Sequence, residues 1–380
     1  MAFSFKNLFS KETHSVLGVD VGSSSIKIVQ LRRERGRAIL ETYGAIALGP
    51  YAGVEIGRAT QLPVEKIVEA LRDVVKEANV TTTEAAFAIP YSSSLISVVK
   101  LPAAVEDRLD QTMPLEARKY IPVPISDVQL DWTLVGGGKN APGGPSDKLE
   151  VMLVAIHNDT IEKYRRIAAD SGLTAAFLEI EVFSAVRASL DHGIAPVAVV
   201  DFGAATTKFY AVERGIVRES HIINHGSQEL TLNASRALSI TVMQAEERKR
   251  RSGLGGGAAP AAPASSLTLR SGIDVHAADA VAAQSFESSL ASIVAEISHT
   301  LVSFETRMQE TISAVVFTGG GATLHGFREY AQSKLQAEVR LADPFSKTET
   351  PAFLEAILKE AGPEFSVAVG LALRRLQEIG

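Results

Sequence analysis

The sequence contains no cysteine among its 380 residues. Disulfide bonds, thiolate metal sites and cysteine nucleophiles are therefore excluded, which is typical of proteins from a reducing compartment. The sequence also has no run of about 18 apolar residues that would span a bilayer, and its first residues lack the apolar segment of a secretion signal. These absences predict a cytoplasmic location.

An excess of positive charge is missing as well. The chain has 38 Lys and Arg residues against 44 Asp and Glu residues, which gives a net charge of -6. This balance provides no overall basic field for a phosphate backbone, so nucleic acid is not an expected partner. Hydrophobic residues make up 46% of the chain, which is typical of globular proteins. Because its length exceeds what one core usually organises, we expect two domains.

Apolar runs of strand length alternate with helical patterns along the chain, which predicts an α/β fold. Residues 16–21 and 26–31 are predicted strands, and residues 64–78 are a predicted helix. Two stretches rich in Gly, Pro, Ala and Ser, residues 136–147 and 252–266, are predicted flexible loops.

The first 15 residues are predicted to form a flexible tail, because chain termini are commonly poorly ordered. The tail places Phe3, Phe5, Leu8 and Phe9 close to lysines. Contact with an anionic membrane surface is therefore the alternative.

One short motif occurs twice in the chain. In each copy an apolar strand ends in an aspartate, a turn of small residues follows, and a second apolar strand begins. The corresponding residues are always 181 positions apart: Asp20 and Asp201, Gly22 and Gly203, Lys27 and Lys208. A single copy is a common tight hairpin, whereas two copies at a constant offset indicate two halves of one site.

The chemistry of these turns suits a polyphosphate. Small residues let successive backbone N–H groups point into one concavity, and an aspartate supplies a hard oxygen ligand for Mg²⁺. The lysine of each copy can add positive charge. The predicted metal ligands are Asp20 and Asp201. The predicted phosphate-binding residues are Gly22, Ser23, Ser24, Ser25, Lys27, Gly203, Ala204, Ala205, Thr206 and Thr207.

A third turn consists of three glycines, Gly319, Gly320 and Gly321, after the apolar run of residues 314–318. Bare backbone there lets a flat base or ribose approach closely. The alternative is a strand-to-helix turn with no ligand, since a helix is expected to follow. The spacing matches neither the dinucleotide fingerprint nor the P-loop, so neither class is predicted.

These three turns, in this order and at these separations, resemble the phosphate 1, phosphate 2 and adenosine motifs of the actin, heat-shock chaperone and sugar kinase superfamily. The resemblance implies an actin-like (ribonuclease H-like) two-domain ATPase fold that binds ATP and Mg²⁺ in the cleft between the domains. It places Asp20 and Asp201 where the superfamily holds Mg²⁺, mostly through water, and Gly319 to Gly321 at the adenosine turn.

The resemblance also implies two connecting helices, expected at residues 178–185 and 362–373. Glu181 lies where ATPase members orient the attacking water, and it is therefore the candidate catalytic residue. Val182 and Ser184 depart from the usual residues of this helix. We therefore expect at most a slow Mg-dependent ATPase.

Residues 84–134 lie where the FtsA and PilM families insert a small subdomain. The stretch Glu116-Ala117-x-x-Tyr120-Ile121-Pro122 is similar to the PilM family of type IV pilus assembly proteins in particular. Pro114, which precedes it, is expected to begin or kink a helix.

Residues 228–251 are predicted to form one amphipathic helix with a charged end. In the FtsA and PilM branch an Ala-Glu-x-x-Lys sequence on this helix borders the adenine and ribose. The resemblance therefore adds Glu246 and Lys249 to the candidate adenosine-binding residues.

The resemblance divides the chain into several parts, and the two domains share the chain discontinuously. The expected parts are a tail (1–15), the first actin-like domain (16–83, 175–195 and 362–380), the inserted subdomain (84–174), the second actin-like domain (196–225 and 313–361) and its subdomain (226–312).

The implied function is a cytoplasmic, ATP-binding scaffold of type IV pilus assembly. Its expected partner is the N-terminal cytoplasmic peptide of a PilN-like inner-membrane protein, so that it reaches the membrane only through that partner. Other pilus assembly components and self-association are further expected contacts. The residues of the peptide groove are not predicted.

Three alternatives remain open. An FtsA-like cell-division filament protein would need a terminal amphipathic helix as an anchor, and none is expected after residue 373. A small-molecule kinase would need an aspartate placed as base against a substrate hydroxyl. A chaperone would need a substrate-binding domain after the ATPase unit.

Overall fold

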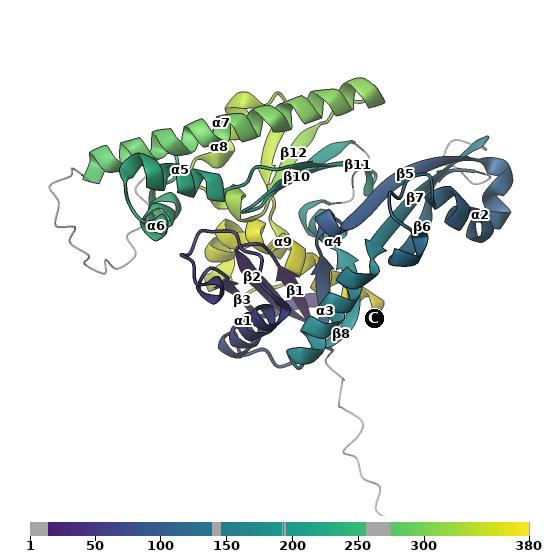
Figure 1. Cartoon of the computed structure of the whole chain (residues 1–380), viewed down its shortest axis with the longest axis horizontal. Helices are drawn as coiled ribbons and strands as arrows, with labels where there is room; N and C mark the ends of the chain where they lie inside the picture. The colour runs from purple at the N-terminus through teal and green to yellow at the C-terminus, as the bar shows by residue number, and fades with distance from the viewer. Residues whose placement is uncertain (1–13, 139–145, 192, 194, 256–274, 380) are drawn as a thin grey trace, which may run out of the picture.

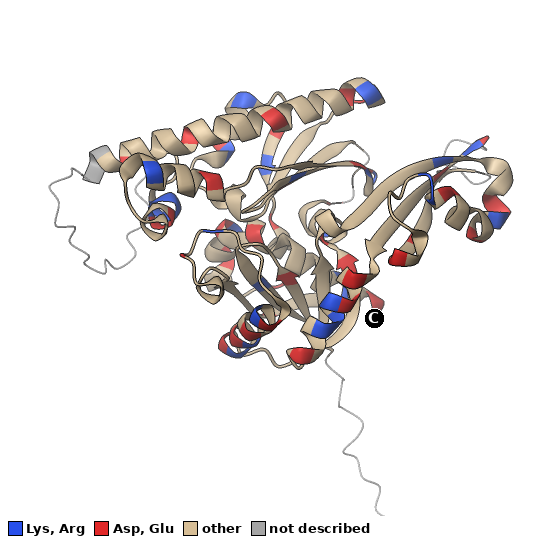
Figure 2. Ribbon diagram, in the orientation of Figure 1, with Lys and Arg blue, Asp and Glu red and all other residues tan. Residues whose placement is uncertain are grey.

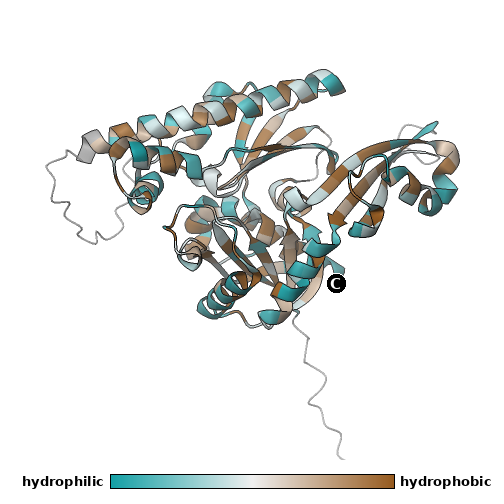
Figure 3. Ribbon diagram, viewed as in Figure 1, coloured by the Kyte–Doolittle hydropathy of each residue, from teal (hydrophilic) through white to brown (hydrophobic). Residues whose placement is uncertain are grey.

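The computed structural model describes residues 14–138, 146–191, 193, 195–255 and 275–379. Two five-stranded sheets form the body, and a smaller three-stranded sheet projects to one side (Figure 1). The strands are mostly hydrophobic, whereas the outer helices mix hydrophobic and hydrophilic residues (Figure 3). Within the described ranges, no helix is long and apolar enough to cross a membrane.

The first sheet is buried on both faces. Its elements are the strands β1 (Ser15–Val21), β2 (Ser25–Glu34), β3 (Arg37–Ala47), β4 (Glu84–Ile89) and β8 (Thr174–Ile180), with the helices α1 (Val64–Glu77), α3 (Asn158–Asp170) and α9 (Glu355–Glu378). The strand order is β3-β2-β1-β4-β8. Leu17 and Val19 pack with α1 and α3, whereas Val16 packs with α9, because successive side chains of a strand point to opposite faces. The predicted strands at 16–21 and 26–31 and the predicted helix at 64–78 are confirmed.

The second sheet repeats the arrangement of the first. Its elements are the strands β9 (Val197–Phe202), β10 (Thr207–Glu213), β11 (Ile216–Ile223), β12 (Ala314–Thr318) and β13 (Glu338–Leu341), with the helices α7 (Val275–Met308) and α8 (Phe327–Lys334). The order is β11-β10-β9-β12-β13. In both sheets the central strand has an antiparallel hairpin partner on one side and a parallel strand on the other. The repeated motif is therefore part of a repeat of whole sheets.

The third sheet forms a separate core with one helix. Its elements are β5 (Ser94–Pro102), β6 (Val128–Gly137), β7 (Lys148–His157) and α2 (Leu109–Ala117). Met113 and Ala117 of α2 pack against this sheet. The bounds expected for the inserted subdomain, residues 84–174, are therefore too wide, because β4 belongs to the first sheet and α3 covers that sheet. The separately packed part lies within residues 94–157.

Pro114 lies inside α2 and does not begin it, contrary to expectation. A proline removes one backbone hydrogen bond, from its own nitrogen to the residue four positions earlier. In α2 that residue is Asp110, in the first turn of a nine-residue helix. The loss is therefore confined to one bond near the helix start.

Two helices connect the sheets and cross closely. The first connecting helix, α4 (Glu181–Ser189), begins at Glu181 and not at residue 178, because residues 178–180 complete β8. The second is the later part of α9. A Cβ on Gly370 would lie 2.0 Å from the carbonyl oxygen of Ser184. Only glycine fits at this crossing.

The single helix predicted at residues 228–251 is wrong. The segment forms α5 (Gln228–Leu238) and α6 (Val242–Ser252), separated by Ser239 in the left-handed region with φ 52°. Thr241 then caps α6 in a reciprocal capping box with Gln244, which fixes a new helix start. Residues 1–13 of the predicted tail (1–15) and most of the predicted loops (139–145 and 256–266) lie outside the described residues, whereas Ser15 already begins β1.

Candidate functional site

The two repeated turns face one cavity of about 590 Å³ between the first and second sheets. All the predicted site residues except Thr207 line it. Thr207 is buried, and its hydroxyl donates to the carbonyl oxygen of His225 at 2.8 Å. The structure therefore brings together candidates from segments almost 300 residues apart (Asp20 to Gly319).

The two turns have the same backbone geometry. Gly22 N–H donates to the carbonyl oxygen of Ser25 at 3.0 Å, and Gly203 N–H donates to that of Thr206 at 3.1 Å. In each hairpin the aspartate lies opposite its lysine across the strand pair. The constant sequence offset thus corresponds to a structural equivalence.

The carbonyl groups of both turns accept hydrogen bonds from neighbouring segments of the chain. Those of Ser23 and Ser24 accept from Thr60 N–H at 2.7 Å and Leu48 N–H at 2.8 Å. In the second turn, Gly203 and Ala204 accept in the same way from the start of α5, at 2.9 and 3.0 Å. Because a trans peptide holds its N–H opposite its C=O, the amide that follows each of these carbonyl groups points away from the donor that the carbonyl accepts from. Both turns line the cavity, so these amides are candidate donors to an anion.

Three carboxylates and two lysines surround the base of the cavity. Asp20, Glu181 and Asp201 are all buried. Burial raises the pKa of Asp20 from 3.8 to about 6, although the charge of Lys27 opposes this. Lys208 Nζ lies 2.9 Å from Glu181 Oε1 and 3.0 Å from Asp201 Oδ2. Burial alone would lower the pKa of Lys208, but these carboxylates raise it well above its ordinary value.

The glycine turn after β12 closes another wall. Gly319 has φ +86°, and a Cβ there would lie 2.4 Å from Asp201 Oδ1. A Cβ on Gly321 would lie 2.5 Å from the ring of Phe202. Both positions therefore require glycine, and the predicted bare backbone is present.

The predicted pair on α6 lies on the same cavity. Lys249 Nζ is 2.6 Å from Glu246 Oε2, and the Thr231 hydroxyl donates to that oxygen at 2.7 Å. Burial alone would raise the pKa of Glu246, but Lys249, Thr231 and Arg250 lower it to about 2. This carboxylate is therefore ionised where it lines the cavity.

A loop of the first sheet reaches across to this wall. Glu55 Oε2 accepts from Val242 N–H at 3.1 Å, and Gln228 Oε1 accepts from Ala59 N–H at 3.0 Å. Between them, Ile56 and Gly57 line the cavity. The sequence did not predict these residues, because the loop carries no motif and meets α6 only in the folded chain.

The donor set fits Mg²⁺ that retains water. Among the described residues, no cluster of three or more His, Asp or Glu side chains forms a complete protein metal site. Asp20 and Asp201 nevertheless place hard oxygen atoms beside the phosphate-suited turns, and Mg²⁺ commonly takes one or two carboxylates plus water and phosphate. The residues present therefore fit a metal that arrives with a polyphosphate.

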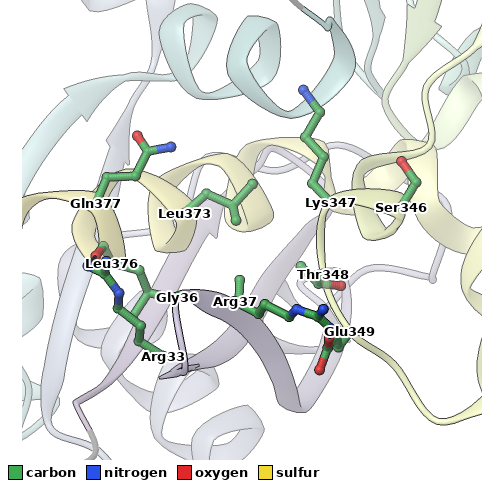
Figure 4. A pocket seen from close by; sticks show the side chains of 11 residues that line it. Arg33, Gly36, Arg37, Ser346, Lys347, Thr348, Glu349, Leu373, Leu376 and Gln377 are labelled. Atoms are coloured by element: carbon green, nitrogen blue, oxygen red, sulfur yellow. Dashed lines mark hydrogen bonds and ion pairs between the residues drawn. The ribbon is translucent and has the colours of Figure 1, made fainter. Parts of the chain in front are cut away.

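A second pocket, of about 550 Å³, lies at the far end of α9 (Figure 4). Its cations already have partners in the protein. Arg37 pairs with Glu349, Arg33 donates to the carbonyl oxygen of Leu376 at 3.1 Å, and Lys347 donates to that of Arg187 at 2.8 Å. The cavity between the sheets is therefore the better candidate.

The chain matches two family models. One, described as type IV pilus assembly protein PilM, matches residues 18–259, which is more than half of the chain. The other, described as cell division protein FtsA, matches residues 198–370.

Three solved structures are similar to the chain over almost its whole length. A PilM-PilN type IV pilus biogenesis complex aligns with 19% identity and a TM-score of 0.73, covering 94% of this chain and 98% of that one. Ethanolamine utilization protein EutJ from Carboxydothermus hydrogenoformans aligns with 16% identity and a TM-score of 0.53, covering 95% and 89%. MreB5 of Spiroplasma citri bound to AMPPNP aligns with 12% identity and a TM-score of 0.50, covering 97% and 98%.

The similar structures show the fold of the chain, and the first family model shows its family. Two sheets of equivalent topology, joined by crossing helices around a central cavity, form the two-domain actin-like architecture that the sequence predicted. The chain belongs to the PilM family of type IV pilus assembly proteins.

Proposed function

We propose that the protein is an ATP-binding scaffold of type IV pilus assembly, with Mg·ATP in the cavity between the sheets. The observation that carries this proposal is the pair of equivalent turns, each with its own buried aspartate, facing one cavity. Two rows of backbone donors match the charge of a polyphosphate from both sides. The similar MreB5 structure was solved with AMPPNP, which supports the choice of ligand.

Each wall of the cavity has a proposed role. The turns at residues 22–25 and 203–206 hold the phosphates, and Lys27 adds positive charge. Asp20 and Asp201 hold the hydrated metal. The turn at residues 319–321, together with Glu246 and Lys249, holds the adenosine.

Hydrolysis is proposed to be slow. Glu181 is the candidate for orienting water, and its Oε1 accepts from Tyr91 N–H at 2.7 Å and from Lys208 at 2.9 Å. These two donors hold the carboxylate in one orientation through Oε1, so that Oε2 is the oxygen left to accept from water. Bound Mg²⁺ would supply charge compensation for the phosphates when ATP is present.

The proposed partner is the N-terminal cytoplasmic peptide of a PilN-like inner-membrane protein. The support is family membership and the similar PilM-PilN complex. The protein would then work in the cytoplasm, at the inner membrane only through this partner. Nucleotide would change peptide affinity only if the peptide binds the open and closed cleft differently.

The nucleotide assignment is tested with two single variants. We expect Asp20→Ala and Asp201→Ala to lose measurable binding of Mg·ATP in calorimetry, because each removes a hard oxygen ligand. Asp110→Ala, at an exposed position of α2, is the matched control and should bind like the wild type. If both cavity variants fold and bind Mg·ATP with unchanged affinity, the nucleotide assignment is refuted.

The partner assignment needs its own measurement. A synthetic PilN-like N-terminal peptide is titrated against the full chain with and without Mg·ATP. Saturable binding that changes with nucleotide is expected. Absence of binding in both states, together with ATP-dependent sedimentation of filaments, would favour the FtsA-like alternative, for which the match over residues 198–370 gives partial support.

A further inference from the structure

The two equivalent lysines of the cavity are used differently. Lys208 lies between two carboxylates, with Nζ 2.9 Å from Glu181 Oε1 and 3.0 Å from Asp201 Oδ2, and its side chain is only 15% exposed. Lys27 lines the same cavity, but it forms no ion pair within 4 Å with any residue in the described ranges. Equivalent positions in the two hairpins therefore have distinct roles.

The contacts of Lys208 join separate parts of the fold. Lys208 lies in β10 of the second sheet, whereas Glu181 is the first residue of α4, directly after the last strand of the first sheet. Glu181 is also held from a third direction, because Tyr91 N–H donates to the same Oε1 at 2.7 Å. The position of this carboxylate is thus fixed by two donors, one from β10 of the second sheet and one from Tyr91, which follows β4 of the first sheet.

The ammonium group also compensates charge where a metal would act. It contacts Asp201, which is one of the two proposed metal ligands. A cation at that distance weakens the attraction of Asp201 for a second cation, because like charges repel strongly where water is scarce. The charge of the empty cavity is therefore partly balanced before any metal binds.

We propose that Lys208 is a positioning residue that restrains Glu181 and Asp201, so that the protein retains ATP with little hydrolysis and its ATP binding depends less on Mg²⁺ than it would without this ammonium group. The inference rests on the proposed function. It goes beyond that function by assigning the slow turnover to one side chain. Removing the ammonium leaves Glu181 Oε1 with the Tyr91 amide as its remaining donor, so that this oxygen can also accept from a water molecule.

The test compares three variants with the wild type. Lys208→Met removes the charge and keeps the length, Lys208→Arg keeps the charge, and Lys27→Met removes the equivalent lysine of the first hairpin. Affinity for a fluorescent ATP analogue is measured with Mg²⁺ and with EDTA, and hydrolysis is measured in a single turnover. Circular dichroism reports whether each variant folds.

The expected results separate the variants. K208M should hydrolyse ATP at least about tenfold faster, which is a small part of what a well-placed general base contributes. Its affinity should also depend more steeply on Mg²⁺ than that of the wild type. K208R should remain close to the wild type in both readouts. K27M should bind more weakly without faster hydrolysis.

Several outcomes would overturn the inference. If folded K208M hydrolyses ATP at the wild-type rate and binds it with the metal dependence of the wild type, Lys208 does not restrain Glu181 or Asp201. If its hydrolysis falls, Lys208 stabilises the phosphates instead. If the wild type itself binds no nucleotide, the proposed function fails, which the binding measurement distinguishes from the two results above.

A buried lysine can be required for folding, because its removal leaves carboxylates unpaired. The double variant K208M/E181Q removes opposite charges together and is the safeguard if K208M does not fold. It retains the metal readout, since Asp201 still loses its ammonium partner. A Mg²⁺ dependence equal to that of the wild type in the double variant would likewise refute the inference.

Discussion

Asp20 illustrates how a single side chain of the cavity destabilises the empty protein. Its carboxyl is buried, and burial raises its pKa from 3.8 to about 6. The folded chain therefore holds this proton more tightly than the unfolded chain does. Between about pH 4 and about pH 6, the free energy of unfolding contributed by this group falls as the pH rises.

Asp20→Asn should stabilise the empty protein at neutral pH. We expect its free energy of unfolding near pH 7.5 to rise by up to about 3 kcal/mol, because one pKa unit corresponds to about 1.4 kcal/mol. The gain should shrink as the pH falls and vanish below about pH 3, where the carboxyl is protonated in both states. Urea unfolding followed by circular dichroism measures the difference, and an equal gain at every pH would contradict the raised pKa.

Glu246 behaves in the opposite way. The interactions with Lys249, Thr231 and Arg250 outweigh its burial and lower its pKa to about 2. Its contribution to stability is therefore present above about pH 4.5 and is lost as the pH falls toward 2. The cavity thus combines one destabilised and one stabilised carboxylate.

At the scale of elements, the close crossing of α4 and α9 depends on the absence of a side chain at Gly370. A Cβ on Gly370 would lie 2.0 Å from the carbonyl oxygen of Ser184, which is backbone and cannot turn away. The same helix packs on β1, where a Cβ on Gly18 would lie 2.0 Å from the carbonyl oxygen of Ala368. Contacts on both sides leave α9 no room to shift.

Gly370→Ala is therefore expected to lower the free energy of unfolding by at least about 2 kcal/mol, the order of an overpacked core. Gly362→Ala in the same helix is the matched control, since its Cβ would meet the side chain of Pro344 at 3.2 Å and needs only a small adjustment. Thermal denaturation compares the two. Equal melting temperatures would show that the crossing is not tightly packed.

The break between α5 and α6 shows why the amphipathic pattern of residues 228–251 misled the prediction. The apolar residues continue at helical spacing, but Ser239 adopts φ 52° and Thr241 caps a second helix. A serine in the left-handed region is not recognisable from hydrophobic periodicity. The break is also what places the first backbone amide of α6, at Val242, within reach of Glu55.

At the scale of the whole molecule, the charged helices α1 and α3 cover the outside of the first sheet, and α7 runs along the second (Figure 2). The cavity lies between these two bodies. The loop that carries Glu55 and Ala59 joins them through one hydrogen bond to α6 and one to α5. This connection lies on the cavity wall, so opening of the cleft there would break both bonds.

Nucleotide should therefore protect both ends of this connection. We expect Mg·ATP to slow hydrogen exchange at the amides of Ala59 and Val242, because a liganded cleft opens less often. Glu55→Ala should lose the protection at Val242. Surface strand β13 serves as the internal control. Exchange that is unchanged by saturating Mg·ATP at both amides would mean that the loop does not report on the cleft.

The local chemistry of the site can be read from the residues and their spacing. The turns around Gly22 and Gly203, the aspartate before each, and the glycines at 319–321 follow from residue type and spacing, because turn geometry and backbone access are set by near neighbours in the chain. Their constant offset indicated two halves of one site. The fold followed from the order of the three turns, whereas the family followed from the stretch Glu116 to Pro122.

How distant charges are paired, in contrast, depends on the folded chain. That Lys208 contacts Glu181, that Tyr91 holds the same oxygen, and that Glu55 reaches α6 all depend on how two sheets are set against each other. Coulombic and hydrogen-bond interactions depend on distances of a few ångströms across the fold. No spacing along the chain encodes these distances, so the partners of the charged residues appear only once the domains are packed.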